Sequence, residues 1–280
     1  MIDLRTGDAL EVLSTMPTGS IHAVVTDPPY GVGLNKATCA WDVWPGKRIW
    51  EECRRVLIPS GFLVWSIAPH IAHERIGDVL SAGFKVVEVG FWVYGNGRPL
   101  NVHRIKRHYD LVYFMATKNR RLYPQQALLL HRSSTITGRK GTLISHTGMS
   151  RQFQNGIKRN FEYGQTDYFP ANVACEDGCE AFGESGYDLI FAVKRHAQIN
   201  SREETHPTTK PVDLIAQQIK LVSRPGETIL DPFMGSGTAG IAAKMLGRSF
   251  IGIDLNPKYV DMAERKISNT QAPLPYEEHP

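Results

Sequence analysis

Residues 228–254 read TILDPFMGSGTAGIAAKMLGRSFIGID, and this stretch decides the fold. TILD predicts a buried strand, and a glycine-rich loop separates it from a helix, TAGIAAKMLG, that ends at Gly247. SFIGID predicts the next strand. Asn256 and Pro257 then supply an N-cap and a first-turn proline for a further helix through Ile267. The stretch is one complete βαβ unit, and such units build parallel sheets.

The same alternation of strands and helices continues through most of the chain. Strands are predicted at IDLRT (2–6), IHAVVT (21–26), FLVWSIA (62–68), FKVVEVGFWVY (84–94), YDLVYFMAT (109–117) and YDLIFAVK (187–194). Helices are predicted at ALEVLST (9–15), KRIWEECRRVL (47–57), stopped by PSG (59–61), HIAHERIGDVLSA (70–82), closed by Gly83, and PVDLIAQQIKLVS (211–223), with Pro211 in its first turn. This pattern predicts an α/β fold of the doubly wound type, a mostly parallel sheet covered by helices on both faces.

The composition of the chain is that of an ordinary soluble protein, with 280 residues, 42% hydrophobic and 21% charged. Its apolar runs are too short to span a membrane, and the N-terminus turns polar too early for a signal peptide. Four cysteines in this length do not make a disulfide framework, which favours a reducing, cytoplasmic setting. Cys175 and Cys179 lack a second Cys/His pair at the usual spacing, so we expect free thiols and no metal.

The charge is unevenly distributed along the chain. Between Gly95 and Asn160 there are thirteen Lys or Arg and one acid, Asp110, so this segment carries +12 in a chain of net charge +4. Such a segment on an otherwise acidic protein points to a polyanionic partner, with a solvated basic loop as the alternative. The strand–helix alternation also stops from 118 to 186, where polar, Gly/Ser/Thr-rich sequence predicts inserted loops.

The glycine loop, Gly235-Ser-Gly-Thr-Ala-Gly240, matches G-x-G-x-x-G, and Asp254 lies nineteen residues after its first glycine. Between a strand and a helix, these features meet the conditions of a dinucleotide-binding fingerprint and, taken alone, favour an NAD-dependent oxidoreductase. S-adenosylmethionine also carries an adenosine ribose that an acid can bind, and its carboxylate can take the place of phosphate at the helix N-terminus. The loop therefore predicts an adenosine-containing cofactor and leaves both choices open.

A second motif, TDPPYGVG (26–33), ends the predicted strand IHAVVT. Proline fixes φ and donates no N–H, so Pro28 and Pro29 stop the strand in any case. The plainer interpretation is a turn. The other is an active site, because the strand would deliver Asp27 and Tyr30 together to the sheet edge where open α/β folds bind ligands.

In this order, TDPPY, HPTTKPVDLIAQQI and LDPFMGSGTAG resemble the amino-methyltransferases that methylate exocyclic nitrogens of bases in DNA. GDALEVLSTMP, RVLIPSGFLVW and FIGIDLNPKYVDMAERKI are similar to flanking blocks of that family, and DYFPANV (167–173) is similar to a segment of some phage and bacterial members. The resemblance covers residues 2–117 and 167–268. A catalytic motif before the cofactor motif resembles the β group, a circular permutation of the Rossmann-like methyltransferase fold.

This resemblance implies a division of the chain into four parts. They are a catalytic half of the methyltransferase domain (1–117), an inserted basic target-recognition region (118–186), a cofactor-binding half (187–268) and a flexible tail (269–280). The implied activity is methyl transfer from S-adenosylmethionine to the exocyclic amino group of a base flipped out of double-stranded DNA. Adenine N6 is favoured over cytosine N4, because family members with Asp in this motif are mostly adenine enzymes.

The resemblance also implies roles for individual residues. Asp27 and the carbonyl of Pro28, held rigid by the Pro28–Pro29 pair, would accept hydrogen bonds from the amino group, and Tyr30 would offer an aromatic face to the base. The residues implied to hold the cofactor are Asp8 near its adenine, Asp254 at its ribose, Thr208 and Lys210 at its methionine end, and Asp231, Phe233, Gly235, Ser236, Gly237 and Thr238 around the glycine loop. Candidate phosphate contacts are Arg104, Lys106, Arg107, Arg139, Lys140, Lys158 and Arg159.

Several alternatives stay open from the sequence alone. Lys210 could be a surface lysine before a helix, and Trp41, Trp44 and Trp50 are interpreted as core or pocket wall instead of a platform for base stacking. The competing functions are an NAD-dependent oxidoreductase, a non-catalytic DNA-binding relative, and a methyltransferase acting on RNA or protein. The recognition sequence, a homodimer and a restriction–modification partner are left open as well.

Overall fold

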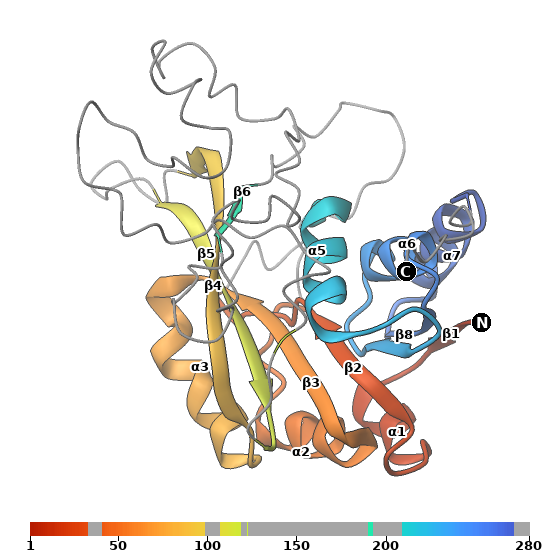
Figure 1. Ribbon diagram of the computed structural model, residues 1–280, viewed down its shortest axis with the longest axis horizontal. Coiled ribbons are helices and arrows are strands. Elements are labelled where there is room, and N and C mark those ends of the chain that lie inside the picture. Colours follow the sequence, from red (N-terminus) through yellow and green to blue (C-terminus); the bar gives the residue numbers. More distant parts are fainter. Residues whose placement is uncertain (33–40, 99–106, 119–121, 123–189, 193–208, 272–280) are drawn as a thin grey trace, which may run out of the picture.

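An eight-stranded sheet lies between two layers of helices (Figure 1). The computed structural model describes residues 1–32, 41–98, 107–118, 122, 190–192 and 209–271. The strands are β1 (Ile2–Thr6), β2 (Ile21–Thr26), β3 (Leu57–Ile67), β4 (Lys85–Arg98), β5 (Arg107–Ala116), β6 (Ile190–Ala192), β7 (Thr228–Asp231) and β8 (Ser249–Asp254). The helices are α1 (Ala9–Ser14), α2 (Lys47–Val56), α3 (Pro69–Ser81), α5 (Val212–Val222), α6 (Thr238–Met245) and α7 (Pro257–Ser268). Within the described ranges, no helix is both long and apolar enough to cross a membrane.

The strand order of the sheet is β1-β8-β7-β2-β3-β5-β4-β6. Every pair of neighbouring strands is parallel except the two pairs that include β5, which runs antiparallel to both β3 and β4. The predicted mostly parallel sheet is therefore confirmed, while the antiparallel direction of β5 was not foreseen. Because β7 lies directly beside β2, two segments from opposite ends of the sequence end at the same place on the sheet edge.

The two faces of the sheet have separate hydrophobic cores. Helices α1, α2 and α3 cover one face, and helices α5, α6 and α7 cover the other (Figure 1). The buried side chains of each group of helices belong to a core of their own. Successive side chains of a strand point to opposite faces of the sheet, so neighbouring residues of β2 belong to different cores. Val24 faces the first core, and Ala23 and Val25 face the second. This arrangement confirms the doubly wound prediction.

The start of β3 differs from the prediction. The PSG sequence was expected to separate a helix from a strand, but α2 ends at Val56 and β3 begins at Leu57, so Pro59 to Gly61 lie inside the strand. The pairing with β2 shifts from Ile21↔Leu57 to Ala23↔Phe62, which is a bulge that accommodates these residues. A Cβ at Gly61 would lie 2.9 Å from the His22 carbonyl oxygen, so the strands can approach this closely only at a glycine.

Aromatic residues fill the core beneath the loop that follows β2. Trp50 and Trp65 are fully buried, and Trp44 packs against both, with ring centroids 5.6 and 6.0 Å away. Tyr113 stacks on Trp65 at 5.2 Å. The core interpretation of Trp50 is thus confirmed, and Trp44 lies at the border between this core and the loop.

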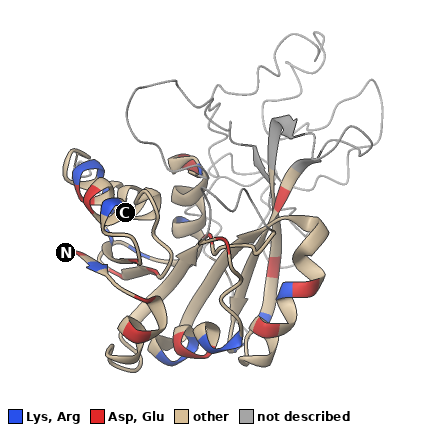
Figure 2. Cartoon of the chain, turned by 180° about the vertical axis from the view of Figure 1, so that it is seen from behind, with Lys and Arg blue, Asp and Glu red and all other residues tan. Residues whose placement is uncertain are grey.

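Charged residues of both signs are interspersed along the helices and strands of the described part of the chain (Figure 2). The predicted inserted region, 118–186, falls outside the described residues apart from Lys118 and Leu122. Cys175 and Cys179 lie outside them too.

Candidate active site

The two sequence motifs meet at the carboxyl ends of β2 and β7. These strands pair in parallel, with Ala23 opposite Ile229 and Val24 opposite Leu230. At their ends the Thr26 hydroxyl donates a hydrogen bond of 2.6 Å to Asp231 Oδ1, across 205 residues of sequence. The strand that supplies Asp27 is therefore joined directly to the strand that precedes the glycine loop.

Asp27 is the residue that β2 presents at this edge. Its side chain is 22% exposed, and both of its oxygens have partners. Tyr30 donates its hydroxyl to Asp27 Oδ1 at 2.8 Å, and the Lys210 ammonium forms an ion pair with Oδ2. Lys210 lies immediately before α5, and its Nζ is also 3.4 Å from the Tyr30 hydroxyl oxygen. The carboxylate is held on both sides by the protein itself.

Two side chains hold the backbone that follows Tyr30. Asp42, which is buried, accepts hydrogen bonds from the Gly31 N–H (2.9 Å) and the Val32 N–H (3.1 Å). From α3, Arg75 donates to the Tyr30 carbonyl at 3.3 Å and to the Gly31 carbonyl at 3.5 Å. Gly31 has φ +67°, and a Cβ there would lie 3.0 Å from the Trp44 backbone nitrogen. The DPPY turn is fixed by these contacts.

Trp44 and Asp78 complete this support on the side of α3. The Arg75 guanidinium lies over the Trp44 ring, 5.6 Å from its centroid. The Trp44 indole N–H donates to Asp78 Oδ2 at 2.6 Å. Since Asp78 is on the same helix as Arg75, one helix fixes both the loop carbonyls and the ring beneath them.

The glycine loop runs from β7 into α6. Gly235 and Gly237 have φ of +52° and +81°, values at which other residues are strained, and Gly237 is the N-cap of α6. Gly237 also lies close to α7, because a Cβ there would be 2.6 Å from Ala263 Cβ. Ser236 is buried, and its hydroxyl is 3.3 Å from that of Thr209, the residue before Lys210. The N-terminal end of α6 is thus packed closely against α7 and against the segment that carries Thr209 and Lys210.

Two buried or half-buried carboxylates flank this loop. Burial raises the pKa of Asp231 to about 7, although hydrogen bonds from Thr26 and the Phe233 N–H oppose the shift. Burial also raises the pKa of Asp254, whose two oxygens accept the N–H groups of Gly235 (2.9 Å) and Asn256 (2.8 Å). A carboxylate oxygen has two lone pairs, so Asp254 can accept further hydrogen bonds from ribose hydroxyls.

The remaining predicted site residues are placed as follows. Asp8 is exposed at the N-cap of α1, where its Oδ1 accepts the N–H groups of Leu10 (2.9 Å) and Glu11 (3.1 Å). It lies near Asp254, because Gly7 N–H donates to the Asp254 carbonyl at 3.0 Å. Phe233 is partly buried, and Thr238 is the first residue of α6. Outside the described side chains lie Thr208, Arg104, Lys106, Arg107, Arg139, Lys140, Lys158 and Arg159.

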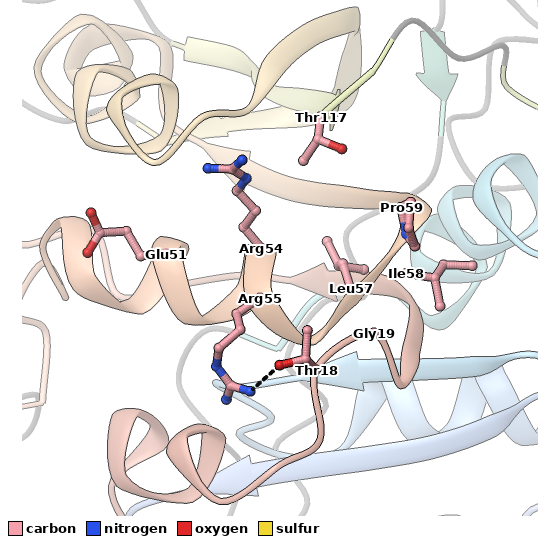
Figure 3. Close-up of a pocket in the computed structure, with 9 residues that line it drawn as sticks. All are labelled: Thr18, Gly19, Glu51, Arg54, Arg55, Leu57, Ile58, Pro59 and Thr117. Carbon is pink, nitrogen blue, oxygen red and sulfur yellow. Dashed lines mark hydrogen bonds between the residues drawn. The ribbon is translucent and has the colours of Figure 1, made fainter.

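A cavity of about 460 Å³ lies elsewhere, at the amino ends of β2 and β3 (Figure 3). Arg54 and Arg55 contribute to its lining, but the guanidinium of Arg55 is bonded to the Leu13 and Met16 carbonyls and to Glu52. Because the two motifs meet at the opposite edge of the sheet, this cavity is not part of the candidate active site.

Four residues that shape the site are not predicted by the sequence: Thr26, Asp42, Arg75 and Trp92. The Trp92 ring centroid lies 5.7 Å from the Lys210 ammonium. Thr26 is adjacent to the motif and could have been suspected from its position. No local pattern singles out the other three, because their contacts depend on how α3, β4 and the loop after β2 pack together.

The chain as a whole is similar to DNA methyltransferases of known sequence and structure. The sequence model of a DNA methylase family, N6/N4-Mtase, matches residues 21–265. The type II methyltransferase M.BglII of Bacillus subtilis is 26% identical over 279 residues, which cover 94% of this chain and 68% of that protein. The crystal structure of the M1.HpyAVI–SAM complex aligns with 95% of this chain and 99% of its own, with a TM-score of 0.58 and 19% identity. The cytosine-N4-specific PvuII DNA methyltransferase aligns with a TM-score of 0.60 and 16% identity, over 95% of this chain and 86% of its own.

Proposed function

The chain belongs to the DNA methylase family, and from this premise we propose that it transfers a methyl group from S-adenosylmethionine to adenine N6 in double-stranded DNA. The observation that carries the proposal is the adjacency of β2 and β7, which brings Asp27 beside the glycine loop. Membership of this family also decides the choice of cofactor against the NAD-dependent oxidoreductase that the glycine loop alone favoured.

Asp27 would act on the amino group of the target base. The lone pair of an exocyclic amine is delocalised into the ring, so the amine is a poor nucleophile. Hydrogen-bond acceptors on both of its N–H groups favour the pyramidal, nucleophilic form, and we assign these roles to the Asp27 carboxylate and the Pro28 carbonyl. Because the Pro28–Pro29 pair is rigid and Asp42 and Arg75 fix the turn, little ordering remains for the reaction step.

Tyr30 would stack against the base. A base inside a duplex is out of reach of Asp27, so it must leave the helix and enter the site. The Tyr30 ring is partly buried, and its hydroxyl is anchored on Asp27, so the stacking surface and the acceptor move as one unit. Stacking of this kind is sequence-tolerant, because every base has a π-face.

The residues around the glycine loop fit an adenosine cofactor with a carboxylate. Asp254 offers acceptor capacity for the ribose at the end of β8, and the helix N-terminus at Gly237 suits a negatively charged group. When bound, S-adenosylmethionine supplies an electrophilic methyl group on a sulfonium. The protein's own contribution is to place and orient the amino nitrogen of the base, which receives the methyl group, through Asp27 and Tyr30.

Adenine is proposed over cytosine because an Asp, not a Ser, precedes the two prolines. The test is to incubate the protein with methyl-labelled S-adenosylmethionine and several unmethylated double-stranded DNAs, then digest the DNA to nucleosides. We expect the label in N6-methyladenine. Label in N4-methylcytosine would overturn the choice of base, and labelled RNA or protein without labelled DNA would overturn the substrate.

A further inference from the structure

Lys210 occupies the position at Asp27 that the proposed reaction requires for the base. Asp27 Oδ2 is paired with the ammonium, and Oδ1 is taken by the Tyr30 hydroxyl. The two oxygens keep further lone pairs, but the ammonium neutralises the charge of the carboxylate and lies on Oδ2, so an amino group of a base has to compete with it for Asp27. The Tyr30 hydroxyl belongs to the same turn, so the ammonium, which comes from a segment 183 residues away, is the partner that can leave independently.

The ammonium is enclosed between two aromatic rings. Its Nζ lies 5.5 Å from the centroid of Tyr30 and 5.7 Å from that of the fully buried Trp92, and the Lys210 side chain is 10% exposed. Faces of aromatic rings attract cations, so the rings of Tyr30 and Trp92 stabilise a positive charge next to Asp27.

Such a charge opposes methyl transfer to nitrogen. The base nitrogen becomes positively charged as its bond to the methyl group forms and the methyl–sulfur bond breaks, leaving S-adenosylhomocysteine, and the nitrogen then loses one proton to Asp27 or to water. While it is paired with the ammonium, the Asp27 carboxylate offers that nitrogen no uncompensated negative charge, so the paired arrangement slows the step. The paired arrangement is therefore a resting state, and Lys210 has to move before the reaction.

The neighbour of Lys210 connects it to the glycine loop. The Thr209 hydroxyl lies 3.3 Å from the hydroxyl of the buried Ser236, two residues before the first residue of α6. A ligand carboxylate at this helix N-terminus would lie beside the segment that carries the ammonium. Thr209 thus contacts the glycine loop, and the next residue, Lys210, contacts the DPPY turn.

We propose that Lys210 is a positioning residue that holds Asp27 in the ligand-free protein and moves to the carboxylate of the methyl donor when that donor binds. The inference rests on the proposed function and adds an order of binding to it. The donor must bind first, because only its amino-acid end releases Asp27 for the base.

Two ligands that share the adenosine separate this effect from simple cofactor binding. S-adenosylhomocysteine carries the amino-acid carboxylate, and methylthioadenosine lacks it. The readout is the fluorescence of 2-aminopurine placed beside the target adenine of a methylatable duplex, because the adenine keeps its 6-amino group and the fluorescence of its neighbour rises when the adenine leaves the stack. In the unmodified protein, we expect S-adenosylhomocysteine to strengthen base engagement about tenfold or more, and saturating methylthioadenosine to leave it unchanged.

Variants at Lys210 give the second arm. In Lys210→Met, which keeps the length and loses the charge, we expect base engagement without any ligand and weaker binding of S-adenosylhomocysteine by calorimetry. Lys210→Arg should retain the dependence on S-adenosylhomocysteine. Lys85→Met, at the amino end of β4, is the matched control and should behave as the unmodified protein.

Equal effects of the two ligands on the unmodified protein would overturn the inference, even if Lys210→Met fails to fold. An unchanged requirement for S-adenosylhomocysteine in a folded Lys210→Met variant would overturn it as well. Absence of methyl transfer by the unmodified protein would instead refute the proposed function, so the two failures are distinguishable.

Discussion

Asp42 stabilises the DPPY turn through two consecutive backbone N–H groups, those of Gly31 and Val32. It is buried, and its removal would take from both donors the carboxylate that they share, where a hydrogen bond to a charged group contributes about 1.5–3 kcal/mol. We expect Asp42→Ala to lower kcat on the order of a hundredfold through misplacement of Asp27 and Tyr30. Binding of S-adenosylhomocysteine should change little, because the glycine loop is on another strand.

Steady-state kinetics and calorimetry on the same preparation check this prediction. The control is Asp261→Ala, which removes an exposed carboxylate on α7. Loss of cofactor binding in parallel with kcat would show that Asp42 supports the whole sheet edge and not the turn alone.

The buried carboxyl of Asp231 makes a second prediction, on pH. Its pKa is about 7 in the folded protein and near 3.9 in an unfolded chain, so the folded state binds the additional proton between these values. The stability due to this proton is complete below pH ~4 and is lost as the pH rises towards 7. Asp231→Asn keeps an acceptor oxygen for Thr26 and Phe233 and cannot ionise.

Urea unfolding at a series of pH values tests this. The free energy of unfolding of Asp231→Asn minus that of the unmodified protein should rise by up to about 1.4 kcal/mol per pH unit between pH 5 and 7. A difference that stays constant over this range would mean that Asp231 keeps an ordinary pKa in the folded protein.

At the residue scale, the sequence was informative where the chemistry lies within one short motif. Asp27 to Tyr30 and the glycines were identified from their order and neighbours. Lys210 was predicted at the methionine end of the cofactor, and the structure pairs it with Asp27, a contact across 183 residues that no local pattern encodes. The roles of these residues remain predictions until they are tested.

At the scale of elements, the β7-α6-β8 unit depends on a glycine for its packing. A Cβ on Gly240 would lie 2.3 Å from Ile267 Cδ1 and 2.8 Å from Cε1 of the fully buried Phe250. We expect Gly240→Ala to destabilise the protein by about 1–3 kcal/mol, because the helix must move away from β8.

Gly77 provides the matched control in denaturant unfolding. It lies exposed within α3, and nothing would contact a Cβ there within 4 Å. Gly77→Ala should stabilise the protein by about 0.5–1 kcal/mol through helix propensity. Equal effects at both positions would contradict the close packing of α6.

Element types followed from the sequence more reliably than their boundaries or directions. The βαβ unit at 228–254 is present as predicted, because its strands are short, apolar and bounded by glycine. Pro59 and Gly61 suggested a break, but a bulge in the pairing with β2 absorbs them. The antiparallel direction of β5 depends on the connection from β4, which periodicity within a single strand does not reveal.

At the scale of the whole molecule, the strand order explains why the order of motifs in the sequence does not matter. The first motif follows β2 and the last follows β7, and these strands are neighbours in the sheet. Permuting the chain changes the connections and leaves this edge intact. The sequence predicted that the motifs would converge, and the pairing of Thr26 with Asp231 is the contact that joins them.

The uneven charge of the whole chain predicts how DNA binding depends on salt. The segment 95–160 carries +12, and Arg139 and Lys140 are proposed phosphate contacts within it. The slope of log K against log salt should fall by about 0.9 for each contact removed, so Arg139→Ala/Lys140→Ala should reduce it by about 2. Fluorescence anisotropy across a salt series measures the slope, with Lys85→Ala as control. An unchanged slope would remove this pair from the DNA interface.

The central claim is that β2 and β7 bring together an acceptor for the base amino group, Asp27, and a site for the methyl donor. The most direct test is the single-turnover rate of methyl transfer by Asp27→Asn, with S-adenosylhomocysteine binding measured on the same protein. We expect a rate lower by about a thousandfold or more, with cofactor binding retained. A rate within a few-fold of that of the unmodified protein would contradict it.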